Sequence, residues 1–136
     1  MRERKWTDCP VCGAKGTMQR KTDVRETVTP HGGYPPVTVE GLDGHYCTEC
    51  GEGFLTSRAQ RKRARILAEH MALHDSQRTP VSEVATVDEA RRVLDVTRQA
   101  VNNMMREGRL RYVYLSGKRL PLRKALVRRK RPAALR

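Results

Sequence analysis

The sequence is poor in the large apolar side chains that usually fill a protein core. It contains one tryptophan and one phenylalanine in 136 residues, and aromatic residues make up only 4% of the chain. A chain of this length forms one modest domain or two very small ones, and each would bury little apolar surface. We therefore expect folding to need support beyond a hydrophobic core.

Long apolar runs are also missing. No segment approaches the roughly 20 residues of a membrane-spanning helix, and the opening segment MRERKWTDCP lacks the apolar stretch of a signal peptide. We therefore expect a cytoplasmic protein that does not associate with a membrane. Thiols stay reduced in the cytoplasm, so cysteine pairs there bind metal more often than they form disulfides.

The four cysteines form two C-x-x-C pairs, CPVCG and CTECG, each followed by glycine. Two intervening residues allow a tight turn to aim both sulfurs at one point, and two such pairs complete a tetrahedral four-thiolate site. We expect one structural zinc ion (Zn²⁺) per chain. The predicted ligands are Cys9, Cys12, Cys47 and Cys50.

Other uses of the cysteines fit less well. A thioredoxin-like redox motif needs a βαβ setting, which the sequence does not show, and two disulfides would need an oxidising compartment. His31 and His45 could compete as ligands, although a lone histidine near a cysteine is more often a bystander. Four thiolates leave no open position on the metal, and no Ser-His-Asp set is visible, so we expect no enzyme and no catalytic residues.

The segment between the pairs predicts two strands, in TMQRKTDVRETV and YPPVTVEGLDGHYC, around a turn-rich loop, PHGGYPP. Together with the two knuckles they predict a small zinc-ribbon-like domain over residues 1–56. Structural zinc contributes on the order of 10–16 kcal/mol of apparent binding energy, which would decide whether so small a domain folds.

Residues 57–80 predict a connecting helix and a linker. Apolar residues recur at helical spacing, Ser57 is a candidate N-cap, and the polar stretch Asp75–Pro80 is typical of a linker. The basic run Arg61–Arg65 could touch phosphates, but the solvated face of an amphipathic helix is the favoured interpretation.

Residues 81–127 predict a winged helix-turn-helix domain. Thr86 and Glu89 fit a capping box, Thr97 can cap a second helix, and Gly108 can end it. Two short helices joined by a tight turn form a helix-turn-helix. A hairpin with a turn at Ser116-Gly117 follows, and its tip would serve as the wing.

The second of these helices exposes side chains suited to a DNA major groove. Arginine pairs bidentately with guanine, and asparagine or glutamine with adenine. The helix N-terminus favours an anion such as phosphate, and the wing adds two cations. The candidate DNA-contacting residues are Thr97, Arg98, Gln99, Asn102, Asn103, Arg106, Lys118 and Arg119.

The charge of the chain is divided unevenly. Residues 1–80 hold 13 Lys and Arg against 10 Asp and Glu, a net charge of +3, whereas residues 81–136 hold 15 against 5, a net charge of +10. A basic excess of this size usually meets nucleic acid. Residues 128–136 are expected to form a disordered basic tail that adds nonspecific phosphate attraction. The fold class expected for the whole chain is α+β.

Residues from about Cys9 to Leu73 resemble the zinc domain of the MqsA-type (YgiT-type) antitoxin family, on the segments CPVCG and VTVEGLDGHYCTECGE. The resemblance implies four zinc-binding cysteines, a domain that binds a partner toxin, and a DNA-binding domain that represses its own operon. Residues Val84–Leu126 instead resemble the MerR/excisionase-type winged domain, whereas the usual partner domain of the family is longer and all-helical.

The leading hypothesis is therefore a zinc-containing transcriptional repressor, the antitoxin of a type II toxin–antitoxin pair. It would bind the toxin through its N-terminal domain and, as a homodimer on an inverted repeat, operator DNA through its C-terminal domain. The alternative is an excisionase-like or other mobile-element DNA-binding regulator with no toxin partner.

Overall fold

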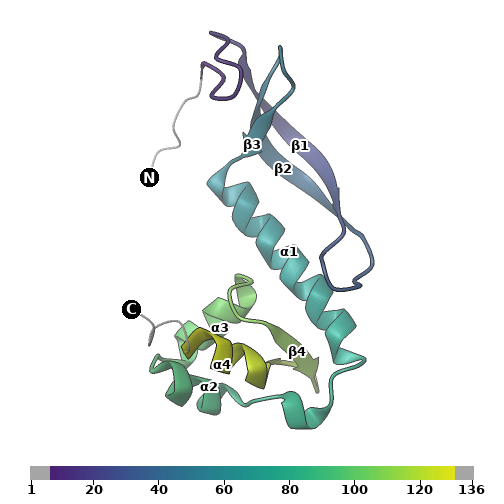
Figure 1. Ribbon diagram of the computed structural model, residues 1–136, viewed down its shortest axis with the longest axis vertical. Coiled ribbons are helices and arrows are strands. Elements are labelled where there is room, and N and C mark those ends of the chain that lie inside the picture. Colours follow the sequence, from purple (N-terminus) through teal and green to yellow (C-terminus); the bar gives the residue numbers. More distant parts are fainter. Residues whose placement is uncertain (1–6, 131–136) are drawn as a thin grey trace. The chain divides into compact units, whose positions relative to one another are not determined.

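An antiparallel hairpin follows the first cysteine pair in the computed structural model, which describes residues 7–130 (Figure 1). Strands β1 (Met18–Val28) and β2 (Val37–Cys47) pair with each other, and β3 (Gly53–Leu55) pairs with β2, so the strand order is β1-β2-β3. The two predicted strands are confirmed. The short third strand was not predicted, because three residues carry no periodic signal.

Glycines in this sheet make room for one aromatic ring. A Cβ atom on Gly44 would lie 2.6 Å from Cε2 of Tyr46, and a Cβ atom on Gly53 would lie 2.4 Å from its Cδ1. Gly53 lies directly opposite Tyr46 in the β2–β3 register. The tyrosine ring therefore occupies the space that side chains at both glycine positions would need.

Helix α1 (Ser57–Ser76) starts directly after β3. The buried hydroxyl of Thr56 accepts a hydrogen bond from the backbone N–H of Ala59 at 3.2 Å. Ser57, the candidate N-cap, is instead the first helical residue, so that prediction is wrong by one position. The backbone N–H of Thr56 also donates to the carbonyl of Asp43 at 2.9 Å, which fixes the helix start to β2.

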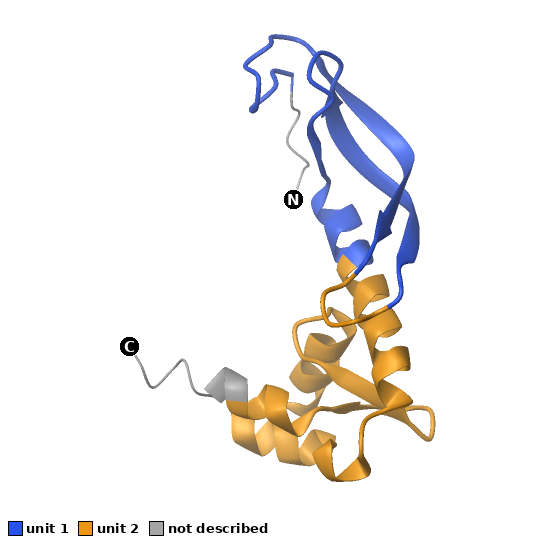
Figure 2. Cartoon of the chain, turned by 45° about the vertical axis from the view of Figure 1, so that its right-hand side comes forward, with its two compact units in different colours: residues 1–29, 35–63 blue, residues 30–34, 64–136 orange. Residues whose placement is uncertain are grey.

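The chain divides into two compact units, coloured separately in Figure 2. We call Met1–Thr29 with Pro35–Arg63 the N-terminal unit, and Pro30–Tyr34 with Ala64–Arg136 the C-terminal unit. The division falls inside α1. Five residues of the loop between β1 and β2, Pro30–Tyr34, group with the C-terminal unit.

The C-terminal unit is built mainly of short helices around a small core. Its buried residues include a single aromatic residue and five large aliphatic or thioether side chains, which agrees with the poverty of the sequence in aromatic residues. The buried residues of this core are Ala72, Ala85, Ala90, Val101, Met104, Met105, Leu110, Tyr112 and Leu126. The secondary-structure elements are the 3-10 turn η1 (Val81–Glu83), α2 (Val87–Leu94), α3 (Arg98–Arg106), β4 (Tyr112–Leu115), β5 (Lys118–Pro121) and α4 (Arg123–Lys130).

Local sequence signals set the ends of α2 and α3. The hydroxyl of Thr86 accepts from the N–H of Glu89 at 3.0 Å, and that of Thr97 accepts from the N–H of Ala100 at 3.1 Å. Gly108 follows α3 with a φ of +81°, the left-handed conformation that favours glycine. Both predicted caps and the predicted helix end are confirmed.

The predicted hairpin is formed by β4 and β5. Ser116 and Gly117 join them with φ angles of +53° and +76°, as a two-residue type I′ turn requires. Helix α4 follows and was not predicted. Its backbone includes residues 128–130 of the segment expected to form a disordered tail, and residues 131–136 lie outside the described part of the chain. Among the described helices, none combines the length and the apolarity that crossing a membrane requires.

Candidate metal centre and candidate nucleic-acid interface

The four cysteines meet at one point of the N-terminal unit. Their sulfur atoms all lie within 4.8 Å of one another. The Sγ atoms of Cys9 and Cys50 are 3.7 Å apart, and those of Cys12 and Cys47 are also 3.7 Å apart. A Zn–S distance of about 2.3 Å separates two sulfurs of a tetrahedron by about 3.8 Å, so these two distances match those of a tetrahedral zinc site.

The two cysteine pairs have the same backbone geometry. Gly13 donates its N–H to the carbonyl of Cys9 at 3.1 Å, and Gly51 donates to the carbonyl of Cys47 at 3.0 Å. Both glycines have φ angles between +76° and +78°. The glycine after each pair thus turns the chain back, which is the role that its place in the sequence predicts.

Each pair begins with a cysteine whose sulfur accepts hydrogen bonds. Backbone N–H groups of Cys12 and Val11, each 3.4 Å from the sulfur, lower the pKa of Cys9 despite partial desolvation. At Cys47 the hydroxyl of Thr17, 3.2 Å from the sulfur, and then the N–H of Cys50 lower the pKa to about 6. These donors favour the thiolate, which is the form that binds a metal.

The second cysteine of each pair is held in the opposite state. At Cys50 a backbone hydrogen bond from Glu52 favours the thiolate, but partial desolvation and the neighbouring sulfurs outweigh it and raise the pKa to about 12. A backbone hydrogen bond from Ala14 is likewise outweighed at Cys12, whose pKa is raised. Four thiols this close cannot all ionise unless a cation balances them, and a divalent ion would supply that charge.

Neither histidine considered as a competing ligand joins this cluster. The cluster that the described residues form consists of cysteines alone. The ring of His45 is buried and lies 5.6 Å from the ring of Phe54, and His31 lines a different hollow, in the C-terminal unit. The donor set is therefore Cys₄, a closed structural type of site.

The face of α3 that was expected to meet DNA is open to solvent. Arg98, Gln99, Asn102 and Arg106 are exposed and Asn103 is half-buried. Val101, Met104 and Met105 point into the core instead. The two sets alternate around α3 as the sequence predicts, so the polar set forms a continuous surface on one side of the helix.

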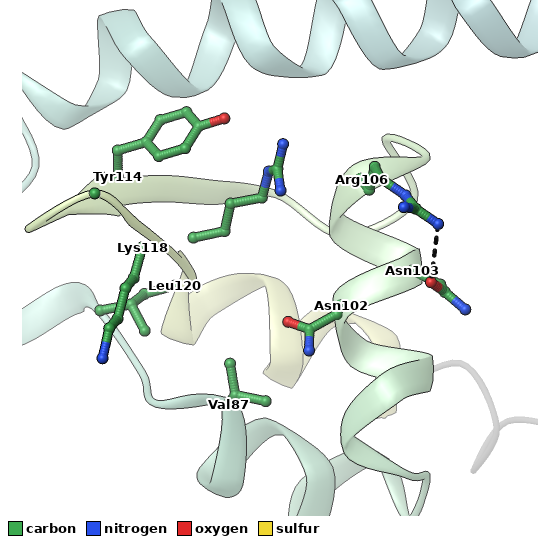
Figure 3. Close-up of a pocket in the computed structure, with 9 residues that line it drawn as sticks. Val87, Asn102, Asn103, Arg106, Tyr114, Lys118 and Leu120 are labelled. Atoms are coloured by element: carbon green, nitrogen blue, oxygen red, sulfur yellow. Dashed lines mark hydrogen bonds between the residues drawn. The ribbon is translucent and has the colours of Figure 1, made fainter.

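A hollow of about 520 Å³ lies between α3 and the β4–β5 hairpin. In Figure 3, Asn102 points from α3 toward the hairpin, with Lys118 and Leu120 on the opposite side. Asn103 accepts a hydrogen bond from Nη2 of Arg106 at 3.2 Å. The hollow is lined by Val87, Asn102, Asn103, Arg106, Tyr114, Gly117, Lys118, Arg119 and Leu120. Five of the eight candidate DNA-contacting residues therefore share one surface.

The two wing cations have different surroundings. Lys118 is exposed at the start of β5, next to the turn. Arg119 is half-buried, and its guanidinium lies 5.7 Å from the ring centre of Tyr112 and 5.6 Å from that of Tyr114. The Lys118 side chain is open to solvent, whereas that of Arg119 packs against two tyrosines of the hairpin.

Three basic residues have partners that the sequence did not predict. Arg98 is paired with Asp88 on α2, a contact between helices that spacing does not reveal. In the N-terminal unit, Arg63 binds Glu26 at 2.9 Å and Lys62 donates to the carbonyl of Gly41 at 3.4 Å. The basic run of α1 is therefore partly used for packing and is not simply a solvated face.

The fold and the sites define a small protein that combines a four-cysteine cluster, able to hold one metal ion, with a strongly basic helical unit. The chain belongs to a family described as "Antitoxin component of bacterial toxin-antitoxin system, MqsA", whose family model matches residues 7–129. The matched range extends through most of the C-terminal unit, beyond the segment from Cys9 to Leu73 on which the sequence resembles this family. No curated protein and no solved structure matches the chain.

Proposed function

We propose that this protein is a zinc-containing antitoxin that neutralises a toxin through its N-terminal unit and represses its own operon through its C-terminal unit. It acts in the bacterial cytoplasm as a regulator and not as an enzyme. Membership of the antitoxin family supports the class. The division of labour rests on the charges of the two halves, +3 for residues 1–80 and +10 for residues 81–136.

The proposed metal is one zinc ion per chain. A Cys₄ donor set with sulfurs 3.7 Å apart suits tetrahedral zinc better than a hard, oxygen-preferring ion. Zinc here would serve folding, since no ligand position remains for water. The buried apolar residues of the hairpin sheet are few, with Val39 and Leu42 the large ones, so the metal would supply much of the stability of the unit.

The C-terminal unit is proposed to be a winged helix-turn-helix. Helix α3 would enter the major groove with Arg98, Gln99 and Asn102 at base edges, while Thr97 approaches a phosphate and Lys118 the backbone. The single observation that carries this proposal is the exposed row of Arg, Gln and Asn on α3 beside the hairpin. Binding as a homodimer to an inverted repeat would double the contacts of so small a unit.

A second candidate is an excisionase-like regulator without a toxin. The observation that favours it is the β4–β5 hairpin directly after α3, which resembles the MerR/excisionase-type arrangement. Both candidates use the same DNA surface, so DNA binding does not separate them. Co-expression of the full chain with the product of the neighbouring gene separates the two candidates. If that product is a toxin, it should be retained by the chain, and the growth inhibition that the toxin causes should disappear.

Gel shifts over a series of salt concentrations test the DNA-reading surface, with a duplex from upstream of the protein's own gene. Gln99→Ala and Asn102→Ala should each lose about 1–3 kcal/mol of binding on that duplex and little on unrelated DNA. Gln77→Ala is the matched control, because Gln77 is exposed in the same unit but directly follows α1 and is not part of α3. Wild-type binding by both α3 variants would mean that α3 does not read the groove.

A further inference from the structure

An acidic residue lies next to the first residue of the proposed DNA-reading helix. Asp88, in the first turn of α2, accepts a hydrogen bond through Oδ1 from Nη2 of Arg98. The two side chains come from different helices and are about half exposed. The same Oδ1 is 4.0 Å from Nε of Arg91, one turn further along α2. Asp88 therefore holds one edge of the Arg98 guanidinium from across the turn between the helices.

The helix dipole favours an acid in the first turn of α2, at Glu89 as well as at Asp88, but stability does not account for the pairing of Asp88 with Arg98. A solvent-exposed ion pair contributes about 0–1 kcal/mol to folding. A negative charge beside a phosphate-facing helix opposes binding to every DNA sequence. Three residues of α3 are proposed to read bases: Arg98, Gln99 and Asn102. We call them the base-reading row. Among the described acidic residues of the C-terminal unit, Asp88 alone is paired with one of them. Glu89 and Glu107 instead pair with Arg123 and Arg109, outside that row.

We propose that Asp88 is a positioning residue that makes binding specific, an inference that rests on the proposed DNA-reading function. It fixes the guanidinium of Arg98 through one N–H and leaves the other donors for a bidentate contact with guanine. Ordering a long side chain before binding removes part of the entropic cost of the contact. The same carboxylate repels phosphates, which weakens binding to unrelated DNA.

Glu89 offers a matched comparison. It occupies the same turn of α2, carries the same charge and pairs with an arginine, Arg123, at 2.5 Å. Neutralising either residue removes one negative charge and one exposed ion pair, but the arginine partner of Asp88 is on α3 and that of Glu89 is on α4. A general electrostatic effect should therefore be the same at both positions, and an effect on base reading should appear at Asp88 alone.

The experiment measures the dissociation constants of the full-length, metal-loaded protein for its own upstream duplex and for an unrelated duplex of equal length. The proteins are wild type, Asp88→Asn, Asp88→Glu, Glu89→Gln, Arg98→Ala and the double variant Asp88→Asn/Arg98→Ala. We expect Glu89→Gln to raise the affinity for both duplexes by the same factor. Asp88→Asn should raise the affinity for the unrelated duplex. The ratio of the affinity for the upstream duplex to that for the unrelated duplex should fall by about tenfold.

Two further results are expected if Asp88 acts through Arg98. In the Arg98→Ala background, Asp88→Asn should no longer change the ratio of the two affinities. With Arg98 present, Asp88→Glu should keep part of the ratio that Asp88→Asn loses. A ratio for Asp88→Asn equal to that for Glu89→Gln would overturn the positioning role while leaving the proposed DNA-reading function intact. A wild-type protein that binds both duplexes equally would overturn the proposed function, and the positioning role with it.

Discussion

The phenol hydroxyl of Tyr34 hydrogen-bonds both carboxylate oxygens of Asp75, at 2.9 Å each. Arg111 joins the cluster, with Nη2 2.7 Å from Oδ2 of Asp75 and 2.5 Å from the phenol oxygen, and Arg78 forms an ion pair with Oδ1 of Asp75 at 3.5 Å. Asp75 is 5% exposed and Tyr34 is 7% exposed. A buried carboxylate is costly unless it is compensated, so this cluster holds the loop residue Tyr34 to the last turn of α1 within the C-terminal unit.

Tyr34→Phe should therefore lower the free energy of unfolding of the C-terminal unit by about 1.5–3 kcal/mol, the range for a hydrogen bond to a charged group. Tyr114→Phe is the control, because its hydroxyl bonds Glu69 at 3.3 Å in an exposed place, and we expect a loss of under about 0.5 kcal/mol. Urea denaturation measures both. Equal losses would show that the Asp75 carboxylate does not depend on Tyr34.

Removing one thiolate should unfold the N-terminal unit. We expect wild type to bind one zinc ion per chain and Cys47→Ser to lose it, because three ligands cannot close the site. The core of the C-terminal unit contains no residue of the cysteine cluster, so the variant should still shift DNA. Thr48→Ala, next to the ligand but exposed, should keep the metal.

Metal analysis and gel shifts on the same preparations measure both properties. Metal-free wild-type protein, freshly purified under reducing conditions, would contradict the zinc assignment. Loss of DNA binding in Cys47→Ser would contradict the independence of the two units.

The two wing cations should separate into a DNA contact and a structural residue. Lys118→Ala should leave thermal stability unchanged, weaken binding to all sequences alike and reduce the salt slope by about one. Arg119→Ala should lower stability by about 0.5–2 kcal/mol, since its guanidinium packs on two tyrosine rings. Thermal melts and a salt series on both variants are the measurements. The reverse pattern, with Lys118→Ala unstable and Arg119→Ala stable, would refute this division.

Alkaline pH should weaken the C-terminal unit through Tyr112. Burial raises the pKa of this tyrosine from its ordinary 10 to about 12, although a hydrogen bond with Arg119 opposes the shift. Between these values the folded protein keeps a proton that the unfolded chain loses. The free energy of unfolding therefore falls as pH rises through this window.

The Tyr112→Phe variant removes that titration. Urea denaturation from pH 9 to pH 12 should show a shallower loss of stability for this variant than for wild type. An identical slope for the two proteins would mean that Tyr112 ionises as readily in the folded state as in the unfolded chain.

Features governed by neighbours in sequence were predictable. The cysteine spacing, the Thr97 cap, the glycine after α3 and the Ser116-Gly117 turn each follow from the chemistry of two to five consecutive residues. The four sulfurs meet because each knuckle is a local structure. The hairpin between the knuckles then brings the two pairs together.

Features governed by distant partners were not predictable. Asp75 looks like part of a polar linker, because the tyrosine that buries it lies 41 residues earlier in the chain. The pairing of Asp88 with Arg98 depends on the angle between α2 and α3. Helix α4 has no apolar stripe long enough to be recognised in the sequence, since Leu126 is the one fully buried side chain among its residues 123–127.

Mapping of amide chemical shifts shows directly whether α3 and the hairpin tip, and not the N-terminal unit, read DNA. The measurement is a titration of isotope-labelled, zinc-loaded full-length protein with its own upstream duplex. If α3 and the hairpin tip read DNA, the largest shifts will be at residues 97–106 and 116–119, and those at residues 9–50 will be small. Large shifts at the cysteine knuckles with α3 unchanged would contradict this prediction.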